Sequence, residues 1–363
     1  MIKTELCEIA GIKYPIVQAG MGPWQTEKLA IASANAGILG MISASGLSAA
    51  ALGLEVIKEP DATEKHEGTS YEIIQKIIRN VASATRESKG IFGVNCMVSQ
   101  ELSTAVGEII KGIVDVREED PDIKDRLRVI ITSAGDPVAW ADSIKPVGIK
   151  WFHVVPSVRH AKRCEKAGVD VIIASGHEGG GHTAWEPVHS MVLLPAITNA
   201  VKTPVIGAGG FCDGATLVAA LALGACGVQM GTRFIATQES AFGNLWKNRV
   251  IKSGERDSLP ARGFVGPLRY LKNDAAMELG ELTLRKTPRL YLGEPDASLD
   301  DEIYKLEDQG MKSLSGDDDE RGLFYGGEAA GRIDDLPPVA ELVQRIVTEA
   351  ENTISSMPKF LQS

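Results

Sequence analysis

The residues from Ser175 to His182 concentrate groups that could do chemistry. They read Ser-Gly-His-Glu-Gly-Gly-Gly-His and follow directly on an apolar run at residues 169–174. A short apolar run is typical of a buried parallel strand, and the glycines after it let a ligand approach the bare backbone. Because imidazole titrates near physiological pH, His182 is a candidate general base. The alternative interpretation is a flexible turn with a solvated histidine.

Two further strand ends marked by glycines predict a phosphate site. Residues 208–214 follow one apolar run and open a helical pattern, and residues 229–234 follow the next run. Backbone N–H groups at Gly209, Gly210 and Gly231 could bind a phosphate, which barrels frequently hold in this corner. Neither loop is a Walker sequence or a G-x-G-x-x-G fingerprint, so a mononucleotide such as FMN is expected. Alternatively, these glycines only tighten two turns.

The elements that must position these loops alternate along the chain, which is the signature of βαβ units. Predicted strands lie at residues 15–18, 40–43, 92–95, 129–132, 151–154, 171–174, 204–207 and 227–230. Eight strands with seven connections favour an α/β fold of the (β/α)8 TIM barrel type over an open doubly wound sheet.

Helical patterns fill the connections between the predicted strands. They lie at residues 26–36, 70–87, 101–114, 158–167, 190–201 and 215–223, and the weakest lies at 136–145. We therefore assign residues 1–236 to an FMN-binding barrel. Residues 237–331 are charged and helix-like, which predicts a helical extension that serves as a lid or substrate domain. Residues 332–363 carry a last amphipathic helix that returns to the barrel.

The composition limits the classes of partner. The chain has 363 residues, 44% of them hydrophobic, and a net charge of −10 at pH 7. Nucleic acids and anionic membranes attract clustered Lys and Arg, so we expect a small-molecule substrate, no nucleic acid and no membrane. Without a signal segment or a membrane-length apolar run, a cytoplasmic protein is expected. The oligomeric state stays open, with a homodimer as one option.

Cysteine and histidine spacing does not favour a metal site. The five cysteines form no C-x-x-C pair. Three glycines between His177 and His182 cannot hold ligand geometry as a helical H-x-x-x-H would, so no metal is predicted. For His153 and His160, which fall on the fifth predicted strand and the helix after it, a packed or solvated imidazole is the expectation.

Five motifs follow one another in a recognisable order. They are Gln18-Ala19-Gly20-Met21, Gly93-Val94-Asn95, Glu178-Gly179-Gly180-Gly181-His182, Ala208-Gly209-Gly210 and Gln229-Met230-Gly231-Thr232-Arg233-Phe234. In this order and spacing they resemble the nitronate monooxygenase family, formerly called 2-nitropropane dioxygenases. That family also contains flavin-dependent enoyl-acyl carrier protein reductases and related acyl-CoA reductases. The resemblance implies an FMN-binding barrel with a helical lid domain.

The resemblance also implies roles for single residues. Family positions that hold FMN are matched by Asn95, Gly180, Gly210, Gln229, Gly231 and Thr232, and Met21 would lie against the flavin. Ser175 stands at a flavin-contacting position where the family usually has glutamine. His182 matches the base toward a nitronate, or lies beside the flavin in the reductases. Gly20 stands where typical nitronate monooxygenases have proline, and with Trp24 it is closer to the enoyl reductases.

Three functions fit these residues. In the first, an alkyl nitronate is oxidised through FMN and oxygen, with His182 as the base. In the second, NAD(P)H is the electron donor and an enoyl thioester of acyl carrier protein or CoA is reduced. The third is a flavin-binding module without catalysis, for which a placed histidine would be unnecessary. The Gly20 and Trp24 pattern favours reduction, whereas the family as a whole favours nitronate oxidation.

Overall fold

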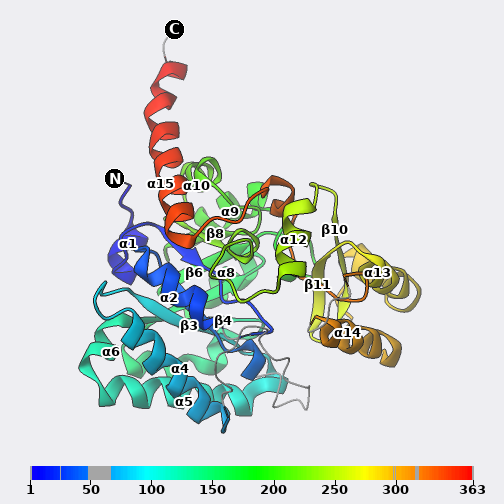
Figure 1. Ribbon diagram of the computed structural model, residues 1–363, viewed down its shortest axis with the longest axis horizontal. Helices are drawn as coiled ribbons and strands as arrows, with labels where there is room; N and C mark the ends of the chain where they lie inside the picture. Colours follow the sequence, from blue (N-terminus) through cyan, green and yellow to red (C-terminus); the bar gives the residue numbers. More distant parts are fainter. Residues whose placement is uncertain are drawn as a thin grey trace.

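Eight parallel strands form the centre of the protein. The structure is a computed structural model that describes residues 2–24, 26–47, 67–296, 298, 300–314 and 319–361 (Figure 1). The strands are β1 (Ile16–Gln18), β2 (Gly40–Ser43), β3 (Phe92–Met97), β4 (Leu127–Ser133), β5 (Lys150–Val155), β6 (Val171–Ser175), β8 (Val205–Ala208) and β9 (Val228–Met230). Their order is β1-β9-β8-β6-β5-β4-β3-β2. All eight predicted strands are therefore confirmed.

Hydrogen bonds between β1 and the residue before β2 close the sheet into a barrel. The Leu39 N–H donates to Ile16 O at 3.1 Å, and the Gln18 N–H donates to Leu39 O at 3.0 Å. The buried Gln18 side chain adds a further link, because its Oε1 accepts from the Met41 N–H at 2.8 Å. The fold is the (β/α)8 barrel that the sequence predicted, and the open doubly wound sheet is excluded.

Both faces of the strands are buried, which explains their continuous apolar runs. One set of side chains, including Val129, Phe152 and Ile206, fills the barrel interior, and the alternate set packs beneath the helices. The short helix α1 (Glu5–Ala10) was not predicted. Its Leu6 packs against the interior set at the amino-terminal end of the barrel, so the end opposite the glycine loops is covered.

Helices occupy the predicted connections. They are α2 (Glu27–Asn35), α4 (Ser70–Ala84), α5 (Ser103–Glu119), α6 (Pro121–Arg126), α8 (Val158–Ala167), α9 (Ser190–Thr198) and α10 (Gly214–Ala222). The connection that gave the weakest pattern holds two 3₁₀ turns, Pro137–Trp140 and Lys145–Val147, on either side of α7 (Ala141–Ile144). Within the described ranges, no helix combines the length and apolar character that crossing a membrane requires.

The extension after the eighth barrel strand contains a β-hairpin that the sequence analysis missed. The eighth barrel strand leads into α11 (Thr232–Ile235), and the helices of the extension are α12 (Asn244–Lys252), α13 (Asp274–Lys286) and α14 (Asp301–Ser313). The hairpin strands β10 (Ser258–Gly263) and β11 (Gly266–Leu271) pair antiparallel beside α13 (Figure 1). A purely helical extension was therefore an incomplete prediction. Two prolines and two glycines within these fourteen residues hide the alternation that normally reveals a strand.

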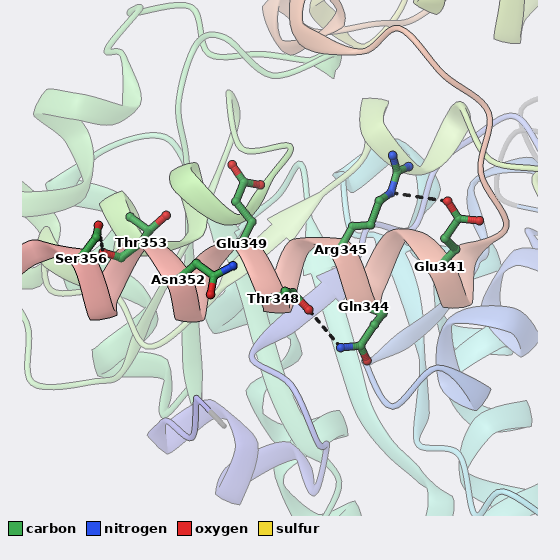
Figure 2. Close-up of a pocket in the computed structure, with 8 residues that line it drawn as sticks. All are labelled: Glu341, Gln344, Arg345, Thr348, Glu349, Asn352, Thr353 and Ser356. Carbon is green, nitrogen blue, oxygen red and sulfur yellow. Dashed lines mark hydrogen bonds and ion pairs between the residues drawn. The ribbon is translucent and has the colours of Figure 1, made fainter.

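The last helix, α15 (Val339–Ser356), lies against α10 and α2. The contact with α10 is close because a Cβ on Gly214 would lie 2.5 Å from Ile346 O, so no larger residue fits there. The Gly214 N–H donates to Glu349 Oε2 at 2.8 Å. On its outer face, polar side chains of α15 line a hollow of about 740 Å³ (Figure 2). Among them, Gln344 forms a hydrogen bond with Thr348, and Arg345 forms an ion pair with Glu341.

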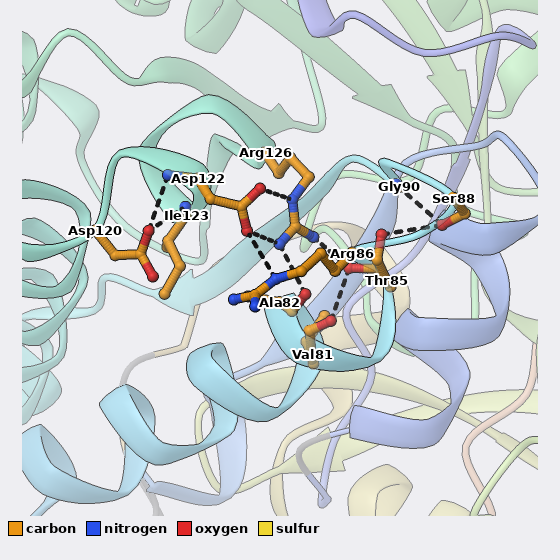
Figure 3. Close-up of polar contacts among 10 residues, drawn as sticks. All are labelled: Val81, Ala82, Thr85, Arg86, Ser88, Gly90, Asp120, Asp122, Ile123 and Arg126. Carbon is orange, nitrogen blue, oxygen red and sulfur yellow. Dashed lines mark hydrogen bonds and ion pairs between the residues drawn. The ribbon is translucent and has the colours of Figure 1, made fainter.

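A buried arginine joins α6 to the end of α4 in the layer of helices around the barrel. The Arg126 side chain is 2% exposed and donates to Thr85 Oγ1 at 2.6 Å and to Ala82 O at 2.7 Å (Figure 3). Its Nε donates to Asp122 Oδ1 at 3.1 Å. These bonds satisfy the polar groups at the end of α4 where water has little access.

We expect Arg126→Met to destabilise the fold by about 2 kcal/mol, because Thr85 Oγ1 and Ala82 O lose their charged donor in a buried place. Urea unfolding of the purified protein measures this loss. Arg79→Met is the matched control on α4, since Arg79 forms a half-exposed ion pair with Glu119 and its loss should stay within about 0.5 kcal/mol. Equal effects from the two variants would contradict a structural role for the Arg126 network.

Candidate active site

A cavity of about 1060 Å³ lies at the carboxyl ends of the barrel strands, between the barrel and the extension. All ten residues that the sequence predicted for the site line this one cavity: Met21, Asn95, Ser175, Gly180, His182, Gly209, Gly210, Gln229, Gly231 and Thr232. The cavity exceeds the volume of most pockets for a single small ligand, so it has room for a cofactor and a substrate. The roles of these residues remain predictions.

The corner at the ends of β8 and β9 is built from backbone. Gly209 and Gly210 both have positive φ angles, +82° and +83°, which side chains rarely adopt. A Cβ on Gly209 would lie 2.6 Å from Gly176 O, so this loop also depends on a close approach to the loop after β6. Within the described chain, the N–H groups of Gly210 and Gly231 have no protein acceptor. They are available to a phosphate.

The side chains near this corner also leave room for a flavin. Gln229 Oε1 is buried and has no hydrogen-bond partner among the described residues, which is costly unless a ligand supplies a donor. Asn95 on β3 packs against Gly20, where any Cβ would overlap the asparagine side chain. Thr232 Oγ1 accepts from the Gly327 N–H at 3.0 Å. The free backbone N–H groups of Gly210 and Gly231 therefore fit a flavin phosphate, and the unpartnered Gln229 oxygen fits a donor on the flavin ring.

His182 belongs to a strand rather than to a flexible turn. Gly181 and His182 form β7, which pairs antiparallel with β11 so that His182 lies opposite Leu268. The Thr183 N–H continues this pairing by donating to Pro267 O at 2.9 Å. The strand pairing excludes a flexible turn at this position, but the His182 side chain is exposed to water, as the alternative interpretation expected.

The environment of His182 keeps its imidazole neutral. The side chain lines the cavity and is exposed to its water. The cavity wall around the ring disfavours the charged form and lowers the pKa of His182 from 6.5 to about 4. At neutral pH the ring is therefore unprotonated, which a general base requires, although it is a weaker proton acceptor than a free imidazole.

Two charged residues that the sequence analysis missed hold the loop between β6 and β7. Glu178 accepts from the Ser190 N–H at 2.8 Å and from Ser190 Oγ at 3.2 Å, at the start of α9. Arg269 on β11 donates to His177 O at 3.1 Å and forms a buried ion pair with Glu328 at 3.2 Å. Arg269 is distant in sequence from the glycine loop, so only the fold brings them together.

The extension supplies the opposite wall of the cavity, where the sequence analysis expected a lid, but the analysis did not single out the charged residues of this wall. Arg262 lies with its guanidinium carbon 5.2 Å from the centre of the Trp185 ring. Glu307 on α14 accepts from the Phe264 N–H and from Tyr270 Oη at 3.1 Å. Burial raises the pKa of the Glu307 carboxyl from 4.5 to about 7. The Arg262 guanidinium, which stays charged, and the Glu307 carboxyl, which titrates near pH 7, therefore face the same cavity.

The other histidines have structural settings. His153 is 2% exposed, and its Nδ1 lies 2.6 Å from Thr132 Oγ1, so the expectation of a packed imidazole is confirmed. The His160 ring bonds Ser157 at the start of α8. The rings of His177 and His189 meet edge to face with centroids 5.6 Å apart. Among the described residues, no group of three or more His, Cys, Asp or Glu could hold a metal ion.

We expect Glu307→Gln to change how stability depends on pH. The folded wild type keeps a proton between pH 4.5 and 7 that the unfolded chain releases, so its stability falls as pH rises through that window. The variant cannot ionise, and its stability relative to wild type should rise by on the order of 2 kcal/mol from pH 5 to pH 8. Urea unfolding at both pH values measures this, and Glu302→Gln on the exposed face of α14 is the control. Parallel pH curves for Glu307→Gln and wild type would contradict it.

Comparison with known proteins places the chain in a family. The nitronate monooxygenase family matches residues 3–349. A 5-hydroxy-7a-methyl-1-oxo-octahydroindene-4-carboxyl-CoA dehydrogenase of Rhodococcus jostii is 29% identical over 98% of both chains. A probable nitronate monooxygenase of Staphylococcus aureus is 32% identical over 73% of this chain and 77% of its own. The structure of FabK from Thermotoga maritima has a TM-score of 0.78 and 28% identity, covering 99% of this chain and 100% of FabK. The chain thus belongs to the nitronate monooxygenase family of oxidoreductases.

Proposed function

We propose that this protein is an FMN-dependent oxidoreductase that oxidises alkyl nitronates with oxygen and uses His182 as a base. The observation that carries the proposal is that a neutral imidazole faces the same cavity as the glycine corner and the unpartnered Gln229 oxygen. A cofactor site and a proton acceptor within one cavity are what a flavin oxidoreductase requires.

The described residues divide the binding of FMN between them. Gly209, Gly210, Gly231 and Thr232 would surround the phosphate, which fits the positive φ angles and the free N–H groups. Gln229, Asn95 and Met21, with Ser175 and Gly180 across the cavity, would contact the rest of the cofactor. When bound, FMN would supply two-electron redox chemistry, including reaction with oxygen.

His182 would move the substrate proton. Its pairing with Leu268 fixes the backbone, and its neutral ring can accept a proton from the carbon next to the nitro group or hold one near the nitronate. The extension, residues 237–331, would act as a lid that excludes water and selects the substrate, because its hairpin and α14 line the cavity opposite the barrel.

Reduction of an enoyl thioester by NAD(P)H is the second candidate. The likeness to FabK over nearly the whole chain and the CoA dehydrogenase relative of full length both favour a thioester substrate. A cavity of about 1060 Å³ is also generous for a small nitronate. Mixing the flavoprotein with NADH or NADPH in the absence of oxygen separates the two functions, since rapid bleaching of the flavin supports the reductase.

The first prediction concerns the cofactor. The purified protein should carry about one FMN per chain, and Gly210→Val should lose it, because valine is strained at a φ of +83° and would move the loop that holds the phosphate. Absorbance of the flavin against protein measures occupancy. Gly148→Val is the control, since Gly148 also has a positive φ but lies in open space outside the cavity lining. Full occupancy in Gly210→Val would show that the corner does not bind the cofactor.

A second prediction tests His182. We expect His182→Ala to retain FMN and to keep its stability within roughly 1 kcal/mol, because the ring faces the cavity and not the core. Turnover of a verified substrate should fall by about 100-fold or more through loss of the proton acceptor. His177→Ala, from the same loop, should have only a mild effect on turnover. If His182→Ala turns over substrate as fast as wild type and the His177→Ala control, His182 is not the base.

A further inference from the structure

Arg262 is a buried cation without an ionic partner. Its side chain is 3% exposed and lines the cavity. The guanidinium donates only to backbone carbonyls, those of Gly263, Phe264 and, at 3.2 Å, Ser298. Its Nε is buried and has no hydrogen-bond partner. None of the ion pairs between described residues involves this side chain, so no carboxylate contacts its charge directly.

The nearest acidic side chains are engaged elsewhere. Glu307 and Asp296 are the carboxylates whose charges act on Arg262. Both Glu307 oxygens accept hydrogen bonds, one from the Phe264 N–H and the other from Tyr270 Oη. Asp296 accepts from the Ser298 N–H at 2.9 Å and from Ser298 Oγ at 2.6 Å. Burial lowers the pKa of Arg262, but a guanidinium does not lose its proton in proteins.

The position of Arg262 relates it to the chemistry of the site. Arg262 pairs with Pro267 across the hairpin, and the next residue of β11, Leu268, pairs with His182. Trp185, which stacks on the guanidinium, follows His182 by three residues. The register puts Arg262 and His182 one step apart, on alternate faces of the three-stranded sheet, and the cavity lining together with Trp185 brings both to the same ligand space.

We propose that Arg262 binds an anionic oxygen group of the ligand that enters the cavity from the side of the extension. A buried guanidinium next to a ligand space is stabilised by an oxyanion, and its planar edge matches a carboxylate, a phosphate or a nitronate. The anion could belong to a nitronate, to the phosphates of a CoA thioester or to the 2′-phosphate of NADPH. This inference rests on the proposed function because it takes the cavity to be the substrate site.

Three matched ligand pairs identify the source of the anion by calorimetric titration of the flavin-loaded protein. They are propyl-1-nitronate against 1-nitropropane, crotonyl-CoA against the crotonyl thioester of N-acetylcysteamine, and NADPH against NADH. In the pair whose charged member binds Arg262, Arg262→Gln should weaken binding of the charged member by about tenfold or more. Binding of the other member of that pair should weaken by less than about threefold. The pair that shows this difference names the anion.

Two further variants separate an anion site from a purely structural role. Arg262→Lys keeps the charge and should retain most of the preference for the charged member. Arg289→Gln is the control, because Arg289 lies in the same extension but is 65% exposed and paired with Glu294. The proposal is overturned if wild type binds no charged member better than its counterpart, or if Arg262→Gln weakens both members equally. Because binding is measured without turnover, selective loss of anion binding in a protein that does not oxidise nitronates would defeat the proposed function and keep the anion site.

Discussion

The antiparallel pairing of β7 with β11 is the contact on which the candidate site depends. Only Gly181 and His182 form β7, yet this pairing joins a barrel loop to the hairpin of the extension. Arg269, from the same strand of the hairpin, holds the loop a second time through the His177 carbonyl. The glycine loop therefore cannot change position without moving the extension, and the backbone of His182 is held relative to both halves of the cavity.

The two halves contribute different physical properties. The barrel offers backbone N–H groups, small residues and amides, which suit a phosphate and a planar ring without a lysine or arginine at this corner. The extension offers the charges, a permanent cation at Arg262 and a carboxyl at Glu307 that titrates near neutral pH. Between them stands a histidine whose lowered pKa leaves it neutral at about pH 7 and whose side chain is exposed to the cavity. The proposal therefore places cofactor binding and ligand choice on separate segments of the chain.

Such a separation would account for relatives that share this fold but are named for different activities. The full-length likenesses include a CoA dehydrogenase and FabK, and the family is that of nitronate monooxygenase. Fold alone does not decide among such activities, because function resides in the groups that contact the substrate. In this chain the hairpin and α14 bring Arg262 and Glu307 to the cavity wall, and we propose that these groups contact the substrate. The extension is therefore the segment in which the activities would diverge.

The sequence could predict the barrel and the members of the site because both follow from local pattern. Apolar runs mark strands that are buried on both faces, and the carboxyl ends of parallel strands converge at one end of a barrel. For this reason Gly210 and Gln229, which follow two neighbouring strands, could be assigned to one site before the fold was known, whereas Asn95 was assigned through the motif resemblance. The motif resemblance added which of them would contact a flavin.

Contacts between distant segments could not be predicted in this way. A two-residue strand such as β7 has no periodicity, and the prolines and glycines of the hairpin conceal its alternation. Nothing near Arg262 or Glu307 in the chain indicates that each will be buried without an ionic partner. The sequence by itself determined the strands, the order of the loops and the identity of the residues at the barrel mouth. Only the tertiary structure decided the pKa of His182 and the charge of the opposite wall, because burial and pairing depend on which segments pack together.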